Sequence, residues 1–485
     1  MSAPVQSEIF AAQPAQDANG VDRSTGDLLS PTLPTRAGDR VRWSGLQGSA
    51  LGLALASAAR GDGARPLIVV TADNHEAERL EAQIRFYAGG PDVLELMHVP
   101  DWETLPYDVF SPHHDIVSER LATLHRLPGL ERGVVITPIT TAMVRIAPRE
   151  FLDAESLMLR AGDRLDVEPF RARLEAAGYR YVSQVMEHGE FAVRGSLLDL
   201  FPMGAKQPLR IDLFDDEIET LRTFDPETQR TADRLSAIEL LPAREFPMTE
   251  AAIARFRQRW RARFEGDPAA CPIYRDISQG LIPAGIEYYL PLFFEHTGTL
   301  FDQLPANALI VHTEGSEQAA HAFWTEITER HEQARHDRER PLLDPIEMFV
   351  PVDEFYGCAA NHPQVRLSRE EDGAETRAKA ARGEVDFATL SPPSLPIEGR
   401  AEDPLKFVKD FLARVARAPG GGRVLFAAES TGRRETLLES FRHHGVQPAA
   451  CAHWQAFAES SDPVAITVAP IDRGLVLPAT HQRPQ

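Results

Sequence analysis

The sequence of 485 residues lacks the signatures of several protein classes. Its three cysteines, Cys271, Cys358 and Cys451, lie far apart without a CxxC pair, which argues against a disulfide framework and a structural zinc site. No apolar run approaches the roughly 20 residues of a membrane-spanning helix. Residues 1–34 have neither the basic start nor the apolar core of a signal peptide. We therefore expect a cytoplasmic protein with no metal site and no membrane contact, and a disordered tail over residues 1–34.

Basic residues are scarce relative to acidic ones. The 51 Lys and Arg residues face 72 Asp and Glu residues, which gives a formal net charge of −21. Proteins that grip nucleic acid neutralise its phosphates with clustered Lys and Arg side chains. Nucleic-acid binding by this chain alone is therefore expected to be weak.

The first part of the chain predicts a parallel α/β fold that is interrupted by an insertion. Over residues 35–145, short buried runs such as LIVV (67–70) and GVVITP (133–138) alternate with helical patterns. Over residues 146–230, short alternating segments with turn residues predict a small, mostly antiparallel α+β domain.

The remainder predicts a return to the first domain and then a small separate one. Helical patterns and a buried strand at 309–311 indicate that the α/β domain resumes over 231–345. Residues 346–400, which contain a Pro-rich linker, are expected to begin a small domain. Its helix, strand and helix patterns predict a small α/β fold over 401–485.

The stretch SGLQGSALG has the outline of a phosphate-binding loop that opens a helix. Gly45 and Gly48 occupy the turn, followed by Ser49, but Leu51 stands where the lysine belongs and Gly52 where the hydroxyl belongs. A working loop needs that lysine to neutralise phosphates and that hydroxyl to bind Mg²⁺. We therefore predict an ordinary strand-to-helix turn that binds no ATP or Mg²⁺.

The strand PLRIDLFDD carries a candidate contact surface. Its period of two places Leu209, Ile211 and Leu213 on one face, with Arg210, Asp212 and Phe214 on the other. An exposed aromatic residue beside an arginine is typical of a protein interface anchor. The alternative is that a neighbouring strand covers Phe214 while Arg210 merely pairs with Asp212. Arg194, in a hairpin-like VRG, would by itself be only a turn arginine.

Five longer segments resemble one bacterial family. DWETLPYDVFSPHHDIVSERLATL, YRYVSQVMEHGEFAVRGSLLDLFPMG, LRIDLFDDEIETLRTFD, LLPAREFP and LIPAGIEYYLPLFF resemble the amino-terminal half of the transcription-repair coupling factors (Mfd), and the same region is similar to UvrB. The resemblance implies a degenerate helicase-like, UvrB-like domain in two parts, 35–145 and 231–345. It also implies that the insertion over 146–230 binds UvrA, and that a further small domain follows.

The resemblance also implies a function. Members of this family recognise RNA polymerase stalled at a DNA lesion, release it with ATP, and recruit UvrA for nucleotide excision repair. The resemblance places the polymerase-binding and helicase domains, which use ATP, Mg²⁺ and double-stranded DNA, downstream of Gln485, so the chain looks like a fragment. Carried over by position, the UvrA contact falls on Arg194, Arg210 and Phe214, and no catalytic residue is expected.

The resemblance identifies a second degenerate position and leaves two other functions to be weighed. The strand ALIVHTEG ends in His312 and Thr313, where a helicase motor carries an acidic pair. One alternative is an ATP-dependent helicase or hydrolase with an unconventional site, against which Leu51 and Gly52 argue. The other is a UvrB-like binder of damaged DNA, but the segment between Tyr107 and Ile116 is too short for UvrB's aromatic hairpin.

Overall fold

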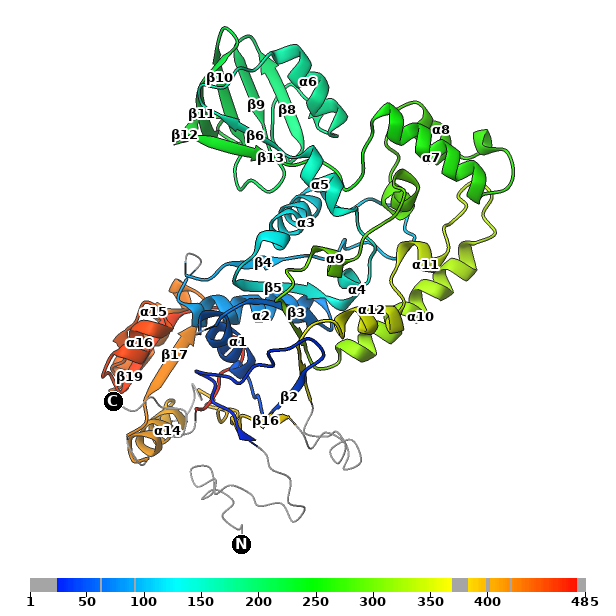
Figure 1. Ribbon diagram of the computed structural model, residues 1–485. Helices are drawn as coiled ribbons and strands as arrows, with labels where there is room; N and C mark the ends of the chain where they lie inside the picture. The colour runs from blue at the N-terminus through cyan, green and yellow to red at the C-terminus, as the bar shows by residue number, and fades with distance from the viewer. Residues whose placement is uncertain are drawn as a thin grey trace.

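The main body of the molecule is an eight-stranded sheet whose neighbouring strands all run parallel (Figure 1). The computed structural model describes residues 24–61, 63–90, 93–368, 383–397, 402–418 and 421–477. The strand order is β1-β16-β2-β15-β14-β3-β5-β4. The strands are β1 (Ser24–Thr25), β2 (Arg40–Ser44), β3 (Pro66–Thr71), β4 (Leu96–His98), β5 (Gly133–Pro138), β14 (Leu309–His312), β15 (Gln364–Leu367) and β16 (Glu384–Asp386).

Both faces of this sheet are covered by helices, which is why β3 and β5 are buried along their whole length. In β3, Leu67 and Val69 belong to a core shared with α1 and α2, whereas Ile68 and Val70 belong to a second core on the other face. The second core includes residues of α3, α4 and α12. The helices are α1 (Ala50–Arg60), α2 (Asn74–Ala88), α3 (His114–Arg126), the 3₁₀ turn η1 (Leu127–Gly129), α4 (Ile139–Ala142), α5 (Arg149–Glu155) and α12 (Val352–Ala359).

The insertion forms its own sheet and projects from the main body beyond α3 and α5 (Figure 1). Its six strands follow the order β12-β11-β10-β9-β8-β7, antiparallel except for the pair β7 and β8, and β13 pairs with β6 beside them. The elements are β6 (Leu157–Arg160), α6 (Val167–Ala176), β7 (Arg180–Tyr181), β8 (Glu190–Arg194), β9 (Leu197–Leu200), β10 (Leu209–Phe214), β11 (Glu217–Phe224), β12 (Thr231–Leu235) and β13 (Ala237–Leu240).

The combination of a parallel sheet and a separate antiparallel sheet confirms the predicted α/β class. The insertion extends further than predicted, since β12 and β13 lie beyond residue 230. The reason is pairing between distant segments: β12 pairs with β11, and β13 pairs with β6 about eighty residues earlier along the chain.

A helical segment rich in aromatic residues follows the insertion. Its core gathers Phe256, Trp260, Tyr289, Phe293 and Phe349, all of them buried. The elements are α7 (Glu250–Arg263), the 3₁₀ turn η2 (Pro268–Ala270), α8 (Pro272–Ser278), the 3₁₀ helix η3 (Ile286–Phe293), α9 (Leu300–Gln303), α10 (Ser316–Ala334) and α11 (Pro345–Met348). Within this region β14 returns the chain to the main sheet.

Residues 346–400 were predicted to begin the small domain, and for the two strands in this range, β15 and β16, that prediction is wrong. β15 pairs with β14 and β2, and β16 pairs with β1 and β2, so both belong to the main sheet. Each strand has only three or four residues, too few for the sequence pattern to reveal which sheet it joins.

The small domain is a three-stranded parallel sheet with helices, at the opposite end of the molecule from the insertion (Figure 1). Its elements are α14 (Lys406–Ala416), β17 (Val424–Ala428), α15 (Thr431–His443), β18 (Ala449–Ala450), α16 (Trp454–Glu459) and β19 (Val464–Val468). Among all the described residues, no helix is both long and apolar enough to cross a membrane.

Candidate partner-binding surface and degenerate nucleotide loop

The loop between β2 and α1 turns at two glycines with left-handed backbone. Gly45 and Gly48 have φ angles of +67° and +62°, a region that favours glycine, and α1 begins at Ala50. Ser49 does not cap this helix. Its hydroxyl is instead hydrogen-bonded to the hydroxyl of Tyr87 on α2, at 2.7 Å, and burial raises the pKa of Tyr87 to about 12.

Two later segments of the chain, residues 386–391 and 473–476, cover this loop; we call them the covering segments. Thr389 donates from its backbone to the Gly45 carbonyl oxygen at 2.9 Å, and its hydroxyl accepts from the Gln47 amide at 2.7 Å. A Cβ atom on Gly48 would overlap the carbonyl oxygen of Gly474. Protein atoms therefore lie against the loop where a phosphate would have to approach it.

The two positions that should carry the chemistry of ATP binding are part of the core. Leu51 is 9% exposed and belongs to the hydrophobic core that α1 and α2 share with the main sheet. A Cβ atom on Gly52 would lie 2.5 Å from the Gln83 Cβ atom, so even a serine hydroxyl has no room there.

The second degenerate position, His312 and Thr313 at the end of β14, is also buried. His312 is 4% exposed, and neither ring nitrogen has a hydrogen-bond partner within the described part of the chain. Burial lowers the pKa of His312 to about 3, with smaller contributions from Arg366 and Arg40. Thr313 donates its hydroxyl to Glu76 of α2 at 2.7 Å. Among the described residues, no group of His, Cys, Asp and Glu side chains is able to hold a metal.

The inserted sheet has one face covered by a helix and one face that is partly open. α6 covers the first face, where Phe170 and Leu174 share a core with Leu198, Leu200 and Ile211. The opposite face carries Arg194, Arg210 and Phe214, as the alternation in β10 predicts, and we call it the arginine face. Val185, Phe201 and Phe224 form a small cluster over part of it.

Phe214 is the most exposed large apolar residue of the described chain, with 75% of its surface accessible. It ends β10, before a tight hairpin in which Asp215 has a φ angle of +60°. The alternative in which a neighbouring strand covers Phe214 is therefore wrong. Asp215 holds the left-handed turn, and Phe214 stands at the end of the strand facing solvent.

Arg194 lies at the same end of the inserted sheet as Phe214, two strands away on β8. It opposes Leu197 across the β8–β9 hairpin, and Leu197 opposes Asp212, two residues before Phe214. Its guanidinium is exposed and donates to the Ser183 carbonyl oxygen at 2.9 Å. Arg194 is thus held near Phe214 while its remaining donors stay available.

Arg210 differs from the other two because it is already paired. It forms a two-pronged ion pair with Asp199, at 2.7 and 2.9 Å, and lies over the Phe224 ring. The Asp199 carboxylate raises the pKa of Arg210. The partner is not Asp212, which instead accepts from Thr220 at 2.5 Å. Only 15% of the Arg210 side chain is exposed. Arg210 therefore stabilises the arginine face through its ion pair with Asp199 and offers little surface to a partner.

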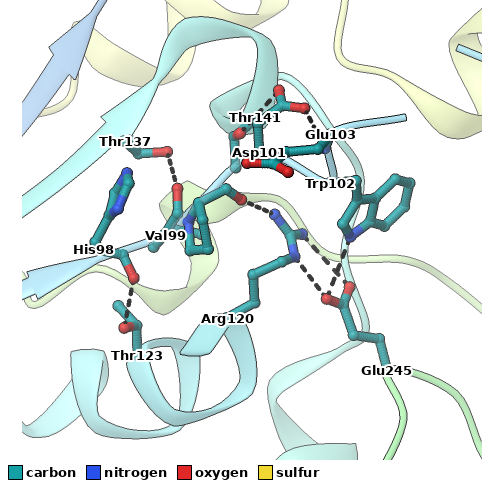
Figure 2. Close-up of polar contacts among 11 residues, drawn as sticks. His98, Val99, Asp101, Trp102, Glu103, Arg120, Thr123, Thr137, Thr141 and Glu245 are labelled. Carbon is teal, nitrogen blue, oxygen red and sulfur yellow. Dashed lines mark hydrogen bonds and ion pairs between the residues drawn. The ribbon is translucent and has the colours of Figure 1, made fainter. Parts of the chain in front are cut away.

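A buried ion pair that the sequence did not reveal fastens the insertion to the main body (Figure 2). Arg120 of α3 donates to Glu245, just after the insertion, at 2.6 Å, and to the Pro100 carbonyl oxygen at 2.9 Å. Trp102 lies beneath the guanidinium and donates to the same carboxylate at 3.5 Å. Arg120 and Glu245 are 125 residues apart, so no local pattern could have paired them.

A second contact joins the same helix to the insertion. His188 contacts Asp115 at the start of α3 at 2.6 Å through Nδ1, and the Ala205 carbonyl oxygen at 2.9 Å through Nε2. The Gly204 amide donates to the Ser118 hydroxyl at 2.8 Å. α3 is therefore the element that orients the arginine face.

Two family models match this chain, one over the insertion and one over the small domain. Residues 157–246 match the model of the UvrB interaction domain, and residues 417–482 match the model of the MFD D3 domain. The chain is 43% identical to the transcription-repair-coupling factor of Escherichia coli (strain K12) over 86% of its own length and 35% of that protein's. For the factor of Haemophilus influenzae the values are 40%, 85% and 35%, and for that of Myxococcus xanthus 33%, 73% and 30%. The chain thus spans about a third of these relatives.

Proposed function

The chain belongs to the family of the transcription-repair-coupling factors, of which it spans about a third, and on this premise we propose that it recruits UvrA. The observation that carries this proposal is Phe214, which is 75% exposed on the same face as Arg194 in the domain that matches the UvrB interaction model. Exposed aromatic and arginine side chains together are the usual anchors of protein interfaces.

We propose a division of labour among the three residues. Phe214 inserts into an apolar pocket of UvrA, and Arg194 adds charge-assisted hydrogen bonds beside it. Arg210 keeps the face in shape through Asp199, so its replacement acts on the surface rather than on a direct contact.

The wider role that we propose is that of the family. The complete factor recognises RNA polymerase stalled at a DNA lesion, releases it with ATP and Mg²⁺, and brings UvrA to the site for excision repair in the cytoplasm. In this proposal the contacts with polymerase and double-stranded DNA belong to parts of the relatives that this chain does not span.

We also propose that this chain turns over no ATP. Leu51 and Gly52 lack the charge and the hydroxyl, and the covering segments lie against the loop. Helicase activity from an unconventional site and UvrB-like lesion binding are the alternatives. Sustained ATP hydrolysis that disappears on changing Gly48 and Ser49 would support the first, and a salt-sensitive complex with lesion DNA the second.

The test is binding of the purified chain to UvrA. Phe214→Ala is expected to weaken binding by at least about tenfold, or 1.4 kcal/mol, as is typical of an interface anchor. Phe110→Ala is the matched control, since Phe110 is 66% exposed but lies outside the insertion. Equal affinity of the Phe214→Ala and wild-type chains would refute the proposed anchor.

A further inference from the structure

Two more arginines lie on the arginine face, in line with Arg210. Arg222 of β11 is directly opposite Arg210, and Arg234 of β12 is directly opposite Arg222. Residues in register on neighbouring strands point to the same side of a sheet. Three arginines therefore form one row across β10, β11 and β12, which ends at the outer strand of the sheet.

Folding alone does not explain this row. Like charges directly opposite each other destabilise a sheet, and only Arg210 is offset, by Asp199. Arg222 is half-buried and Arg234 is exposed, and neither side chain has a hydrogen bond or an ion pair to any residue that the structure describes. The chain has 72 acidic residues, yet none of those described neutralises these two.

We propose that Arg222 and Arg234 extend the UvrA-binding surface and dock an acidic patch of that partner. This inference rests on the proposed function, and it assigns different tasks to the two parts of the surface. Phe214 supplies apolar burial at the end of β10. The two unpaired guanidinium groups attract carboxylates on the approaching partner and fix its orientation across the sheet.

The same chemistry suits a protein surface better than nucleic acid. A nucleic-acid duplex is bound by neutralising many phosphates, and this face offers two unpaired arginines and Arg194 in a chain of net charge −21. Protein interfaces, in contrast, are enriched in arginine and aromatic residues together. The occupant that we infer is therefore an acidic protein surface with an apolar pocket.

The experiment reverses both charges in the full chain with Arg222→Glu/Arg234→Glu. The control is Arg160→Glu/Arg173→Glu, which makes the same change in net charge at two exposed arginines, on β6 and on α6, the helix that covers the other face. Binding to UvrA is measured as association and dissociation rates at low and high ionic strength. Rim charges act mainly on the association rate and are screened by salt.

We expect the double reversal to slow association by about tenfold or more at low salt, with the difference shrinking at high salt. The control should stay within about twofold of wild type, and Phe214→Ala should lose affinity at both salt concentrations. Arg222→Gln/Arg234→Gln, which adds no repulsion, should give an intermediate effect and guards against a folding defect from the buried part of Arg222.

Each outcome bears on one claim. A reversal that matches the control, while Phe214→Ala still loses binding, overturns the arginine row and leaves the proposed function intact. If the wild-type chain does not bind UvrA, the proposed function itself is refuted. A reversal that abolishes binding to a DNA duplex and spares UvrA would show that the row serves nucleic acid, and would overturn the inference.

Discussion

The ion pair between Arg120 and Glu245 allows a quantitative prediction. Both side chains are almost wholly inaccessible, with 1% and 4% exposed, and they join α3 to the segment that leaves the insertion (Figure 2). Arg120→Met keeps much of the side-chain volume but removes the guanidinium. Among the described residues, the 3.5 Å contact from Trp102 is then the one hydrogen bond left to the buried Glu245 carboxylate.

The expected cost follows from that burial. Removing one member of a buried ion pair costs about 3–5 kcal/mol because the other charge is left without compensation. The lost donor to the Pro100 carbonyl oxygen adds about 1 kcal/mol. Arg120→Met/Glu245→Gln should be less destabilised than the sum of the single variants, because the second change neutralises the charge that the first one orphaned.

Urea unfolding combined with hydrogen exchange at α3 measures this effect in a chain of several domains, where a single unfolding free energy is not defined. The control is Arg126→Met, which breaks the surface pair of Arg126 with Glu95, 59% and 38% exposed, and should cost no more than about 1 kcal/mol. If Arg120→Met exchanges no faster at α3 than Arg126→Met, the ion pair does not fasten the insertion and the reasoning fails.

Two further predictions concern the degenerate nucleotide site. The folded pKa of His312, about 3, lies below the ordinary value of 6.5, so the stability that its neutral form contributes is complete above pH 6.5 and declines as the pH falls toward 3. His312→Leu should therefore remove about 2 kcal/mol of the local stability lost around β14 between pH 6.5 and 5, seen as a smaller change in hydrogen-exchange protection of β14 between these pH values; an unchanged difference would contradict the burial argument. Gly48→Ala should displace the covering segment at Gly474 and speed hydrogen exchange at the Val476 amide, which donates to Leu390. Gly63→Ala is its control, because Gly63 shares the left-handed backbone (φ +73°) but has no atom within 4 Å of an added Cβ atom; equal exchange in the two variants would show that the contact at Gly474 is not what holds the segment.

The local pattern of the sequence was enough to predict the elements and the two faces of β10. Alternation placed Leu209, Ile211 and Leu213 on one face and Phe214 on the other, because side-chain direction in a strand depends only on parity. That Phe214 is exposed on its face was decided by the structure. The unbroken apolar runs of β3 and β5 likewise predicted buried strands of a parallel α/β fold. The loss of lysine and hydroxyl at Leu51 and Gly52 could be read directly, since those positions are defined by spacing from the glycines.

Only the tertiary structure decided which residues meet. Strand pairing brought β15 and β16 into the main sheet. It also made Asp199, and not Asp212, the ion-pair partner of Arg210. Arg222 and Arg234 are aligned with Arg210 across three strands by the same pairing. It also brought the covering segments, more than 300 residues further along the chain, onto the loop at Gly48. A sequence pattern reports which way a side chain points, whereas its partner depends on strand register and on how distant segments pack, and these are set by the burial of the whole core.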